Sequence, residues 1–583
     1  MLYPTLTELD TSRQAIDVFG GYNHNLRIGE GEFYDMTNLT SADYPVLSPR
    51  PQRGVYATPD SPQGLISKDA LCYVDGEDFV INERRVHAGL STRAEDCPKS
   101  LISMGAYVII MPDKKYIDTA NFESQTEFSI EASIETSSDT SFTLCKIDGA
   151  EYEDAVVSST APKDPKNLDL WLDTSSTPNV LKIYAETTEM WTSVATTYIK
   201  ISSPGIGKPF AVGDGVTISG ITVEDLADLN NTMVIWGKGD DHIIVTGILT
   251  YVATQEGAIK VERRMPNMDF VIESGNRLWG CRYGIALNGS VVNEIYASKL
   301  GDFKNWNCFA GISTDSYVAS VGTDGVFTGA VTHLGYPLFF KENCVHKVYG
   351  NYPANYQIQT TTCRGVQKGC HKSLAIVNET LFYKSRSAVC AYDGSLPSEI
   401  SSALGDVVYD NAVAGVLGNK YYISMQDVQG EYSLFVFDTA KGMWHREDNT
   451  QVADFCNCRG DLYYIDYADK HIKTVLGTGD KDTSMVKWRA VTGFIGTENP
   501  DKKYVSRIVA RLSLEVGATV VFSIEYDSSG EWEHLFTKSG TKLGSISIPV
   551  RTRRCDHFRL RIEGVGMVKI FSIVKTVEQG SDV

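Results

Sequence analysis

The chain has 583 residues, 42% hydrophobic and 22% charged, with 50 Gly, 30 Tyr and 22 Phe. This composition is typical of a globular protein rich in turns and aromatic strands, and the length predicts about two to four domains. The net charge of −19 argues against general binding to nucleic acid, because such binding rests on Lys and Arg contacts to phosphate. No apolar run approaches the roughly 20 residues that span a bilayer, and the start "MLYPTLTELD" has no export signal.

Residues 1–58 are predicted to form an extended N-terminal arm. Pro45, Pro49 and Pro51 exclude a helix at its end and favour extended conformations for the residues before them. We expect the arm either to close the ring of a propeller or to lie across a neighbouring subunit and add backbone hydrogen bonds there. The arm residues that we expect at such a subunit interface are Phe19, Tyr22, Phe33, Tyr34 and Arg50.

Residues 59–117 and 265–485 repeat a hairpin pattern that predicts a β-propeller. The stretch "GYPLFFKENCVHKVYG" from Gly335 shows it: an apolar strand, a polar turn and a second alternating strand. Similar stretches recur at intervals of about 40–45 residues, which is the period of propeller blades. They begin at Lys68, Met104, Gly275, Gly335, Asn378, Gly418 and Gly460. We therefore predict an all-β fold with six or seven blades, whose paired aromatic residues pack between blades.

Two regions differ in texture from the blades. Residues 118–264 are predicted to be one or two small β-domains inserted into the propeller, with Trp171 and Trp191 as candidate glycan contacts, although burial in a small core explains them as well. Residues 486–583 alternate apolar and polar positions and predict a C-terminal antiparallel β-sandwich. Its Arg551, Arg553 and Arg554 are candidate contacts to an acidic neighbouring subunit; a solvated strand face is the alternative.

No motif indicates catalysis, a cofactor or a metal site. The acidic residues form no privileged pair for a glycosidase, the His lack zinc-ligand spacing, and no phosphate-binding loop is present. Cys363 and Cys370 are a candidate disulfide pair, but free thiols are the simpler expectation. On these grounds we predict that the chain is not an enzyme and has no cofactor.

The arm resembles the opening of tailed-bacteriophage tail hub, tail nozzle and packaged-DNA stabilisation proteins. The matching stretches are "FGGYN" from Phe19, "GEF" from Gly31, "DMTN" from Asp35 and "PRP" from Pro49, and the blades around Phe339 and Val389 are also similar. The inserted region departs from that family and looks like modules of phage fibre and adhesion proteins.

The resemblance implies a structural protein of the virion neck or tail. Copies would form a homo-oligomeric ring, six-fold in preference to twelve-fold, that contacts portal, adaptor and other tail proteins and extends the DNA channel below the portal. It would retain and later release the genome, with DNA passing transiently and without sequence recognition through an acidic lumen. Assembly in the host bacterial cytoplasm and no membrane insertion also follow. A glycan-binding propeller or a propeller glycoside hydrolase remain alternatives.

Overall fold

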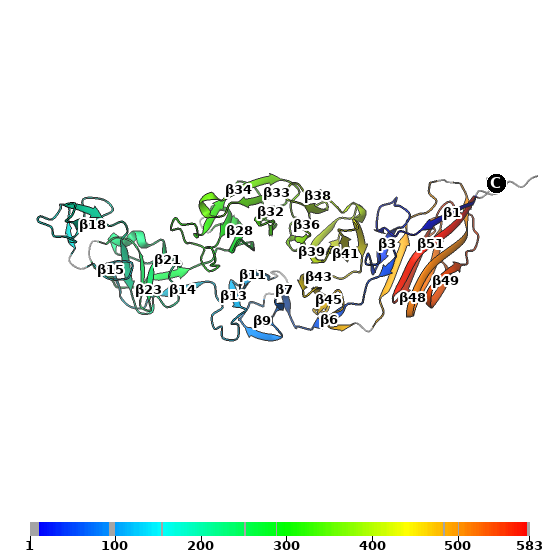
Figure 1. The fold of residues 1–583 in the computed structure, drawn as a ribbon, viewed down its shortest axis with the longest axis horizontal. Helices are drawn as coiled ribbons and strands as arrows, with labels where there is room; N and C mark the ends of the chain where they lie inside the picture. Colours follow the sequence, from blue (N-terminus) through cyan, green and yellow to red (C-terminus); the bar gives the residue numbers. More distant parts are fainter. Residues whose placement is uncertain are drawn as a thin grey trace, which may run out of the picture.

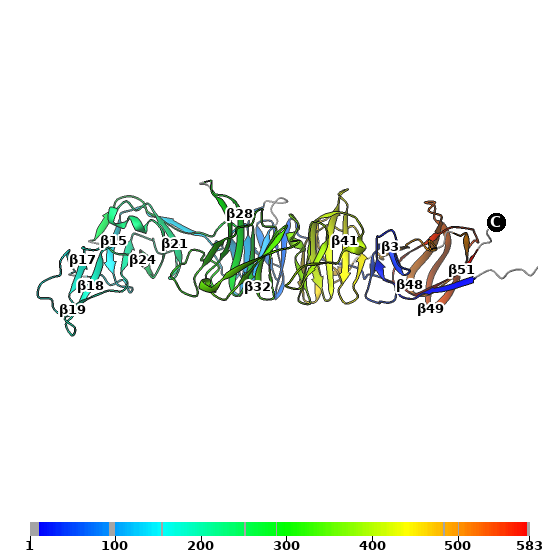
Figure 2. The same ribbon diagram turned by 90° about the horizontal axis from the view of Figure 1, so that it is seen from above.

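The computed structural model describes residues 11–92, 99–152, 155–249, 252–286, 289–481, 484–498 and 501–579. The protein is elongated, and a propeller occupies its middle (Figure 1). The inserted region extends from one side of the propeller and the C-terminal domain from the opposite side, as a view turned by 90° also shows (Figure 2). The described helices are single 3-10 segments, none long enough to span a membrane.

Within the described residues the propeller has seven blades, each an antiparallel sheet, and in the first six the strands follow one another in the chain. Blade one consists of β7 (Pro62–Lys68), β8 (Ala70–Asp75), β9 (Asp78–Ile81) and β10 (Arg84–His87). Blade two consists of β11 (Ser100–Met104), β12 (Tyr107–Met111) and β13 (Lys115–Asp118). Blade three consists of β27 (Phe270–Ser274), β28 (Arg277–Ile285), β29 (Val291–Ala297) and β30 (Tyr317–Ser320). Blade four consists of β31 (Gly329–His333), β32 (Tyr336–Lys341), β33 (Cys344–Tyr349) and β34 (Gln357–Thr362). Blade five consists of β35 (Ala375–Val377), β36 (Thr380–Lys384), β37 (Val389–Tyr392) and β38 (Ser398–Glu399). The sixth is β39 (Tyr409–Leu417), β40 (Lys420–Asp427), β41 (Tyr432–Asp438) and β42 (Met443–Arg446). The predicted all-β propeller is thus confirmed, with the higher of the two blade numbers.

The seventh blade closes the ring with a strand from the arm. It comprises β43 (Val452–Cys458), β44 (Asp461–Asp466), β45 (Ile472–Thr474), β6 (Gly54–Ala57) and the short β46 (Asp480–Lys481). Strand β6 pairs antiparallel with β45, Thr474 opposite Gly54. Of the two roles expected for the arm, it therefore performs ring closure within its own chain.

Paired aromatic residues hold neighbouring blades together, as the sequence predicts. The Phe340 ring lies 5.2 Å from Tyr383 in the next blade, and Phe382 lies 5.3 Å from Tyr421 in the blade after that. Tyr422, on the opposite face of its strand, joins the apolar cluster shared with blade seven. Adjacent residues of a strand point to opposite faces, so each pair serves two interfaces. Each buried ring contributes about 1.5–3 kcal/mol to stability.

The inserted strands form three sheets beside the propeller. Two of them share one apolar core. One contains β14 (Ala132–Glu135), β26 (Lys260–Arg263), β21 (Gly215–Ser219) and β22 (Thr232–Val234); the other contains β23 (Gly237–Gly239), β24 (His242–Thr246), β20 (Tyr198–Ser202), β15 (Thr140–Cys145) and β25 (Ala253–Gln255). The third, between β15 and β20, contains β16 (Val156–Ser158), β17 (Leu170–Asp173), β18 (Val180–Ala185) and β19 (Met190–Ser193). The inserted region also contains the 3-10 segment η1 (Glu224–Leu229).

The C-terminal domain is built around one long, bent strand. Its strands are β47 (Lys487–Thr492), β48 (Lys503–Tyr526), β49 (Glu533–Ile548), β50 (Phe558–Val565) and β51 (Val568–Gln579), with β1 (Thr11–Ile16) from the arm. The first half of β48 pairs with β51 and its second half with β50, and the change occurs around Gly517 at φ +84°. The apolar faces of both halves share one core, so the arrangement is an antiparallel sandwich.

Candidate functional sites: the arm clasp, the propeller axis and a face pocket

Two arm strands connect the propeller to the C-terminal domain. Strand β2 (Gly21–Tyr22) pairs with β42 of blade six, and β3 (Glu32–Thr37) pairs with β47 of the C-terminal domain. Because β2 and β3 also pair with each other, blade six and the C-terminal domain belong to one twelve-stranded sheet. We call β2, β3 and their two partner strands the arm clasp.

The arm residues predicted to contact a neighbouring subunit lie within this clasp instead. Phe19, Tyr22 and Phe33 are exposed by 4%, 6% and 1%, because they pack against their own chain. The prediction that these three side chains contact a neighbour is therefore wrong: no surface of theirs remains for one. Tyr34 is half-buried and stacks 4.2 Å from His24, and Arg50 is half-buried as well.

Two glycines explain why the arm motif takes its form. Gly21 has φ +86°, and a Cβ there would lie 2.4 Å from the carbonyl oxygen of Trp444. Gly31 has φ +96°, and a Cβ there would lie 2.3 Å from the carbonyl oxygen of Val18. Only glycine tolerates both the left-handed conformation and these approaches. The "FGG" and "GEF" stretches are thus requirements of the clasp.

A buried ion-pair cluster fixes the end of the arm on blade six. Arg53 lies 2.7 Å from Glu447 and 2.9 Å from Asp448, and Arg50 lies 3.3 Å from Asp448. Burial raises the pKa of Asp448, but the two guanidinium groups outweigh it and hold that pKa below its usual range. Since the cluster joins the arm's ring-closing segment to the blade, it supports both ring closure and the clasp.

The C-terminal arginines lie on the surface of the sandwich. Arg551, Arg553 and Arg554 are all exposed. Arg553 forms a 3.1 Å ion pair with Glu533 and lies over the Tyr526 ring. Their position is open to a neighbouring subunit, and that role stays a prediction.

The two tryptophans of the inserted region serve its small third sheet. The Trp171 ring packs against Trp191 at 5.4 Å, and its indole N–H donates to the carbonyl of Ser158. Trp171 is 6% exposed, so core packing accounts for it. Trp191 is half-buried and stays a predicted glycan contact.

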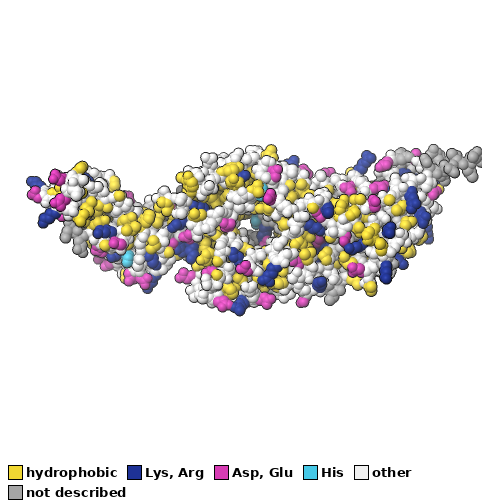
Figure 3. All heavy atoms as spheres, in the orientation of Figure 1, with side chains coloured by type: hydrophobic (Ala, Val, Ile, Leu, Met, Phe, Trp, Pro, Cys, Tyr) yellow, Lys and Arg dark blue, Asp and Glu magenta, His cyan; other side chains and the backbone are white. Residues whose placement is uncertain are grey.

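A cavity of about 760 Å³ lies where the innermost strands of the propeller meet, and Figure 3 shows the molecule hollowed there. Its charged residues are engaged with their own chain. Lys372 lies 3.4 Å from Asp454, and Lys99 pairs with Asp113. Burial, followed by the charge of Lys372, lowers the pKa of His371 to about 4, so this imidazole is neutral at pH 7. The described charged residues along the propeller axis are therefore mainly paired with other residues of the same chain.

The carboxylates along this cavity likewise accept hydrogen bonds from nearby backbone amides. Asp454 accepts the amide of Leu65, Glu273 that of Asn276, and Asp269 that of Tyr283. Burial raises the pKa of Asp269 above its ordinary value. A glycosidase site places two carboxyl groups on either side of the scissile bond, and the described carboxylates along this cavity are instead hydrogen-bonded to their own backbone.

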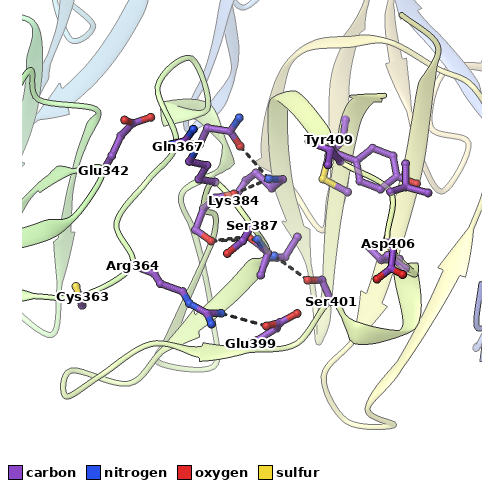
Figure 4. A pocket seen from close by; sticks show the side chains of 18 of the residues that line it. Glu342, Cys363, Arg364, Gln367, Lys384, Ser387, Glu399, Ser401, Asp406 and Tyr409 are labelled. Atoms are coloured by element: carbon purple, nitrogen blue, oxygen red, sulfur yellow. Dashed lines mark hydrogen bonds and ion pairs between the residues drawn. The ribbon is translucent and has the colours of Figure 1, made fainter. Parts of the chain in front are cut away.

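A second cavity, of about 960 Å³, opens on the face of the propeller between blades four, five and six (Figure 4). The β32–β33 and β36–β37 turns and the linkers to the next blades surround it. Lys384 is 3% exposed, and its ammonium group donates to Gln367 and to the carbonyl of Ser385. It forms no ion pair with any described residue, and burial lowers its pKa.

Other charged side chains line the mouth of this face pocket. Arg364 pairs with Glu399 at 3.1 Å, as the dashed line in Figure 4 marks. Arg386 is exposed and has no hydrogen bond or ion pair within the described residues. Glu342 and Asp406 add carboxylates. This pocket was not among the predicted sites, although the basic turn "YKSRS" after a blade strand is a signal for it in the sequence.

The cysteines provide no further site. The eleven described cysteines, Cys363 and Cys370 among them, are free thiols, so the candidate disulfide between those two is wrong. The remaining one, Cys97, lies outside the described residues.

Comparison with known proteins finds neither a matching protein family nor a matching curated protein. The solved structures that match include an exo-β-1,3-galactanase from Phanerochaete chrysosporium, at 8% identity and TM-score 0.20, covering 52% of this chain and 94% of that one. A GH43 glycoside hydrolase matches at 10% identity and TM-score 0.20, covering 52% and 96%. A Trypanosoma rangeli sialidase mutant matches at 9% identity and TM-score 0.18, covering 98% and 96%.

These matches correct one prediction. They are glycoside hydrolases and a sialidase, so the prediction that the chain is not an enzyme is contradicted. At these identities and TM-scores, no substrate and no residue role passes from them to this chain.

Proposed function

We propose that this chain is a structural subunit of the neck or tail of a tailed-bacteriophage virion, and that copies of it form a ring around the DNA channel. The observation that carries the proposal is the arm clasp. The arm stretches that resemble the phage family are the ones that form β2 and β3 and place Gly21 and Gly31 where only glycine fits.

The clasp gives the protein the form that a ring subunit needs. A continuous sheet runs from blade six into the C-terminal domain, so these two parts move together. The inserted region projects from the other side of the propeller (Figure 1), which leaves separate ends for neighbours above and below the ring. A six-fold ring is the proposed symmetry, with portal or adaptor and other tail proteins as its contacts.

The charge agrees with a passage for DNA. At a net charge of −19, the chain repels phosphate overall, so DNA could slide through the ring during release without sticking to its wall. Mass analysis of purified tailed particles from the same source tests the proposal. We expect the chain at several copies per particle; its consistent absence would overturn the proposal.

The face pocket favours a second candidate function, recognition of an anionic saccharide. Among the described residues, no carboxylate forms an ion pair with the buried Lys384 or with Arg386 at the mouth, so an anionic group would find two positive partners. The carboxylates of Glu342 and Asp406 could accept hydrogen bonds from sugar hydroxyl groups.

A glycan array with the wild type and the variants Lys384→Met and Arg386→Ala tests this candidate. Arg511→Ala, an exposed change in the C-terminal domain, is the matched control. We expect binding of acidic glycans that both pocket variants weaken at least tenfold and the control leaves intact. Turnover of chromogenic glycosides, assayed in parallel, would extend the candidate to hydrolysis. Absence of binding to acidic glycans by the wild type would overturn it.

A further inference from the structure

Within the described residues, the C-terminal sandwich has two strand edges with no neighbouring strand. There, strand β1 pairs with β51 and β49 pairs with β48, and neither has a second strand partner. Within the described residues, no other backbone hydrogen bond reaches Ser12–Ile16 or Glu533–Ile548. An open edge presents a row of unpaired N–H and C=O groups to any suitable strand.

These two edges bound the same layer of the sandwich. The strand order there is β1, β51, β48, β49, and the pairing across all four strands is regular from Ile508 to Ala510 of β48, with register shifts on either side. One row runs through Ile16, Ile573, Ala510 and Ile546, and the row two residues away runs through Gln14, Lys575, Ile508 and Ile548. The two edges therefore lie at the same position along the strand direction, on opposite sides of one sheet.

The side chains along both edges favour strand pairing. The regular part of β49 has the sequence "GSISI", in which Ser545 and Ser547 are exposed and Ile548 is buried. In β1, Ala15 is exposed and Ile16 is buried. Proteins usually protect an open edge with charge, proline or a bulge, and Gly544–Ile548 has none of these. On the core side, Ile16 of β1 and Ile546 and Ile548 of β49 thus continue the apolar face of the sandwich, whereas Gln14 of β1 on that side is exposed.

We propose that β1 of one copy pairs antiparallel with β49 of the next copy, so that one β-sheet layer continues from subunit to subunit around the ring. This inference rests on the proposed ring. Within one copy, neighbouring strands of the layer alternate in direction, so β1 and β49 run in opposite directions. A second copy placed beside the first in the same orientation brings its β1 antiparallel to β49, the more stable pairing.

The shared position of the two edges along the strand direction predicts the register between β1 of one copy and β49 of the next. Two copies placed side by side without a shift along the strand direction have Ile16 opposite Ile546 on the core face and Ala15 opposite Ser547 on the solvent face. The contact uses two different edges, so it is heterologous, and repeated rotation closes it into a ring. Each copy would offer one edge and receive the other.

A cysteine pair tests this contact. Opposed residues of paired strands have Cβ atoms about 4.5–5.5 Å apart, close enough for a disulfide after slight adjustment. In the full-length double variant Ala15→Cys/Ser547→Cys, we expect oxidation to give a ladder of covalent oligomers on a non-reducing gel. The wild type and the two single variants are controls for crosslinks through the chain's own free thiols, and Ala15→Cys/Ser433→Cys places the second thiol on a propeller blade.

The outcomes separate this inference from the proposed function. Rings by electron microscopy together with a ladder specific to the Ala15/Ser547 pair support the inference. Rings without such a ladder, or with one from the blade control alone, overturn the inference and leave the ring. The absence of rings and of any ladder overturns both.

Discussion

Tyr22 of the arm stands opposite Trp444 of blade six in the antiparallel pair that fastens the arm to the propeller. The Phe435 ring contacts both, at 5.6 Å and 6.4 Å. Trp444 also donates its indole N–H to the carbonyl of Ile400, at 2.8 Å. One small cluster thus ties the arm, blade six and the linker from blade five together, which makes the clasp a defined target for mutation.

Replacing Gly21 by alanine should destabilise the clasp. The change adds left-handed strain and a clash with the Trp444 carbonyl oxygen, and we expect a loss of about 2–4 kcal/mol. Urea unfolding followed by tryptophan fluorescence measures it, because Trp444 and Trp488 lie on the two sides of the clasp.

Gly418→Ala is the matched control for that change. Gly418 also has a positive φ, +57°, but a Cβ there meets nothing within 4 Å. The Gly418→Ala change should lower the free energy of unfolding only by the strain of the left-handed conformation, about 1–2 kcal/mol. Equal losses of stability in Gly21→Ala and Gly418→Ala would contradict a role for the close approach of Gly21 to the Trp444 carbonyl oxygen.

Removing one charge from the buried cluster should cost more than removing one at the surface. Glu447→Gln leaves the buried Arg53 without its 2.7 Å partner, and we expect a loss of about 3–5 kcal/mol. Glu399→Gln removes the partner of Arg364 in an exposed pair and should cost less than about 1 kcal/mol. Urea midpoints check both, and a Glu447→Gln cost as small as that of Glu399→Gln would contradict the argument.

Phe382→Ala should weaken the contact between blades five and six. The ring is 4% exposed and lies 5.3 Å from Tyr421, so its removal leaves a cavity worth about 3–5 kcal/mol. Ile376→Ala, at a 39% exposed position of the same blade, is the control and should cost far less. Thermal unfolding of both variants measures the difference, and similar melting temperatures would argue against aromatic packing as the inter-blade contact.

Acid should destabilise the propeller through His346. Its two ring nitrogens lie 2.9 Å from the Thr323 hydroxyl and 2.8 Å from the Thr360 hydroxyl, and burial, followed by the charge of Lys341, lowers its pKa to about 4. The unfolded chain, with a His pKa of about 6.5, binds the proton more readily. The stability contributed by neutral His346 is therefore present above pH of about 6.5 and is lost as the pH falls toward 4.

The size of this pH effect can be measured. The shift corresponds to roughly 3 kcal/mol at full protonation, as an order of magnitude. Melting temperatures of the wild type and of His346→Gln between pH 7 and 4 check it. The variant should show a flatter pH dependence, and parallel curves would contradict the assignment.

The sequence predicts local elements well because they depend on local chemistry. The hairpin at Gly335 appears as β32 and β33, and after strand β41 the side chain of Asp438 accepts hydrogen bonds from the backbone amides of Ala440 and Lys441, as Asp does in turns. The recurrence of such hairpins is sufficient to predict a propeller.

The arm could not be predicted in the same way. Its apolar residues are widely spaced, so the sequence does not show whether Phe19 and Phe33 pack within their own chain or against a neighbour. The strands that pair with the arm, β42 with Trp444 and β47 from Lys487, lie more than 400 positions away in the sequence. The face pocket escaped prediction for the same reason, since Lys384 and Tyr409 converge only after blades five and six form.

Electron microscopy of the purified protein, alone and mixed with components of the tailed particle, tests the central claim most directly. The account predicts rings with a central hole, each subunit an elongated body with the propeller in its middle, and six-fold averages. Dispersed elongated monomers under every condition, with no ring formed alone or on particle components, would contradict it.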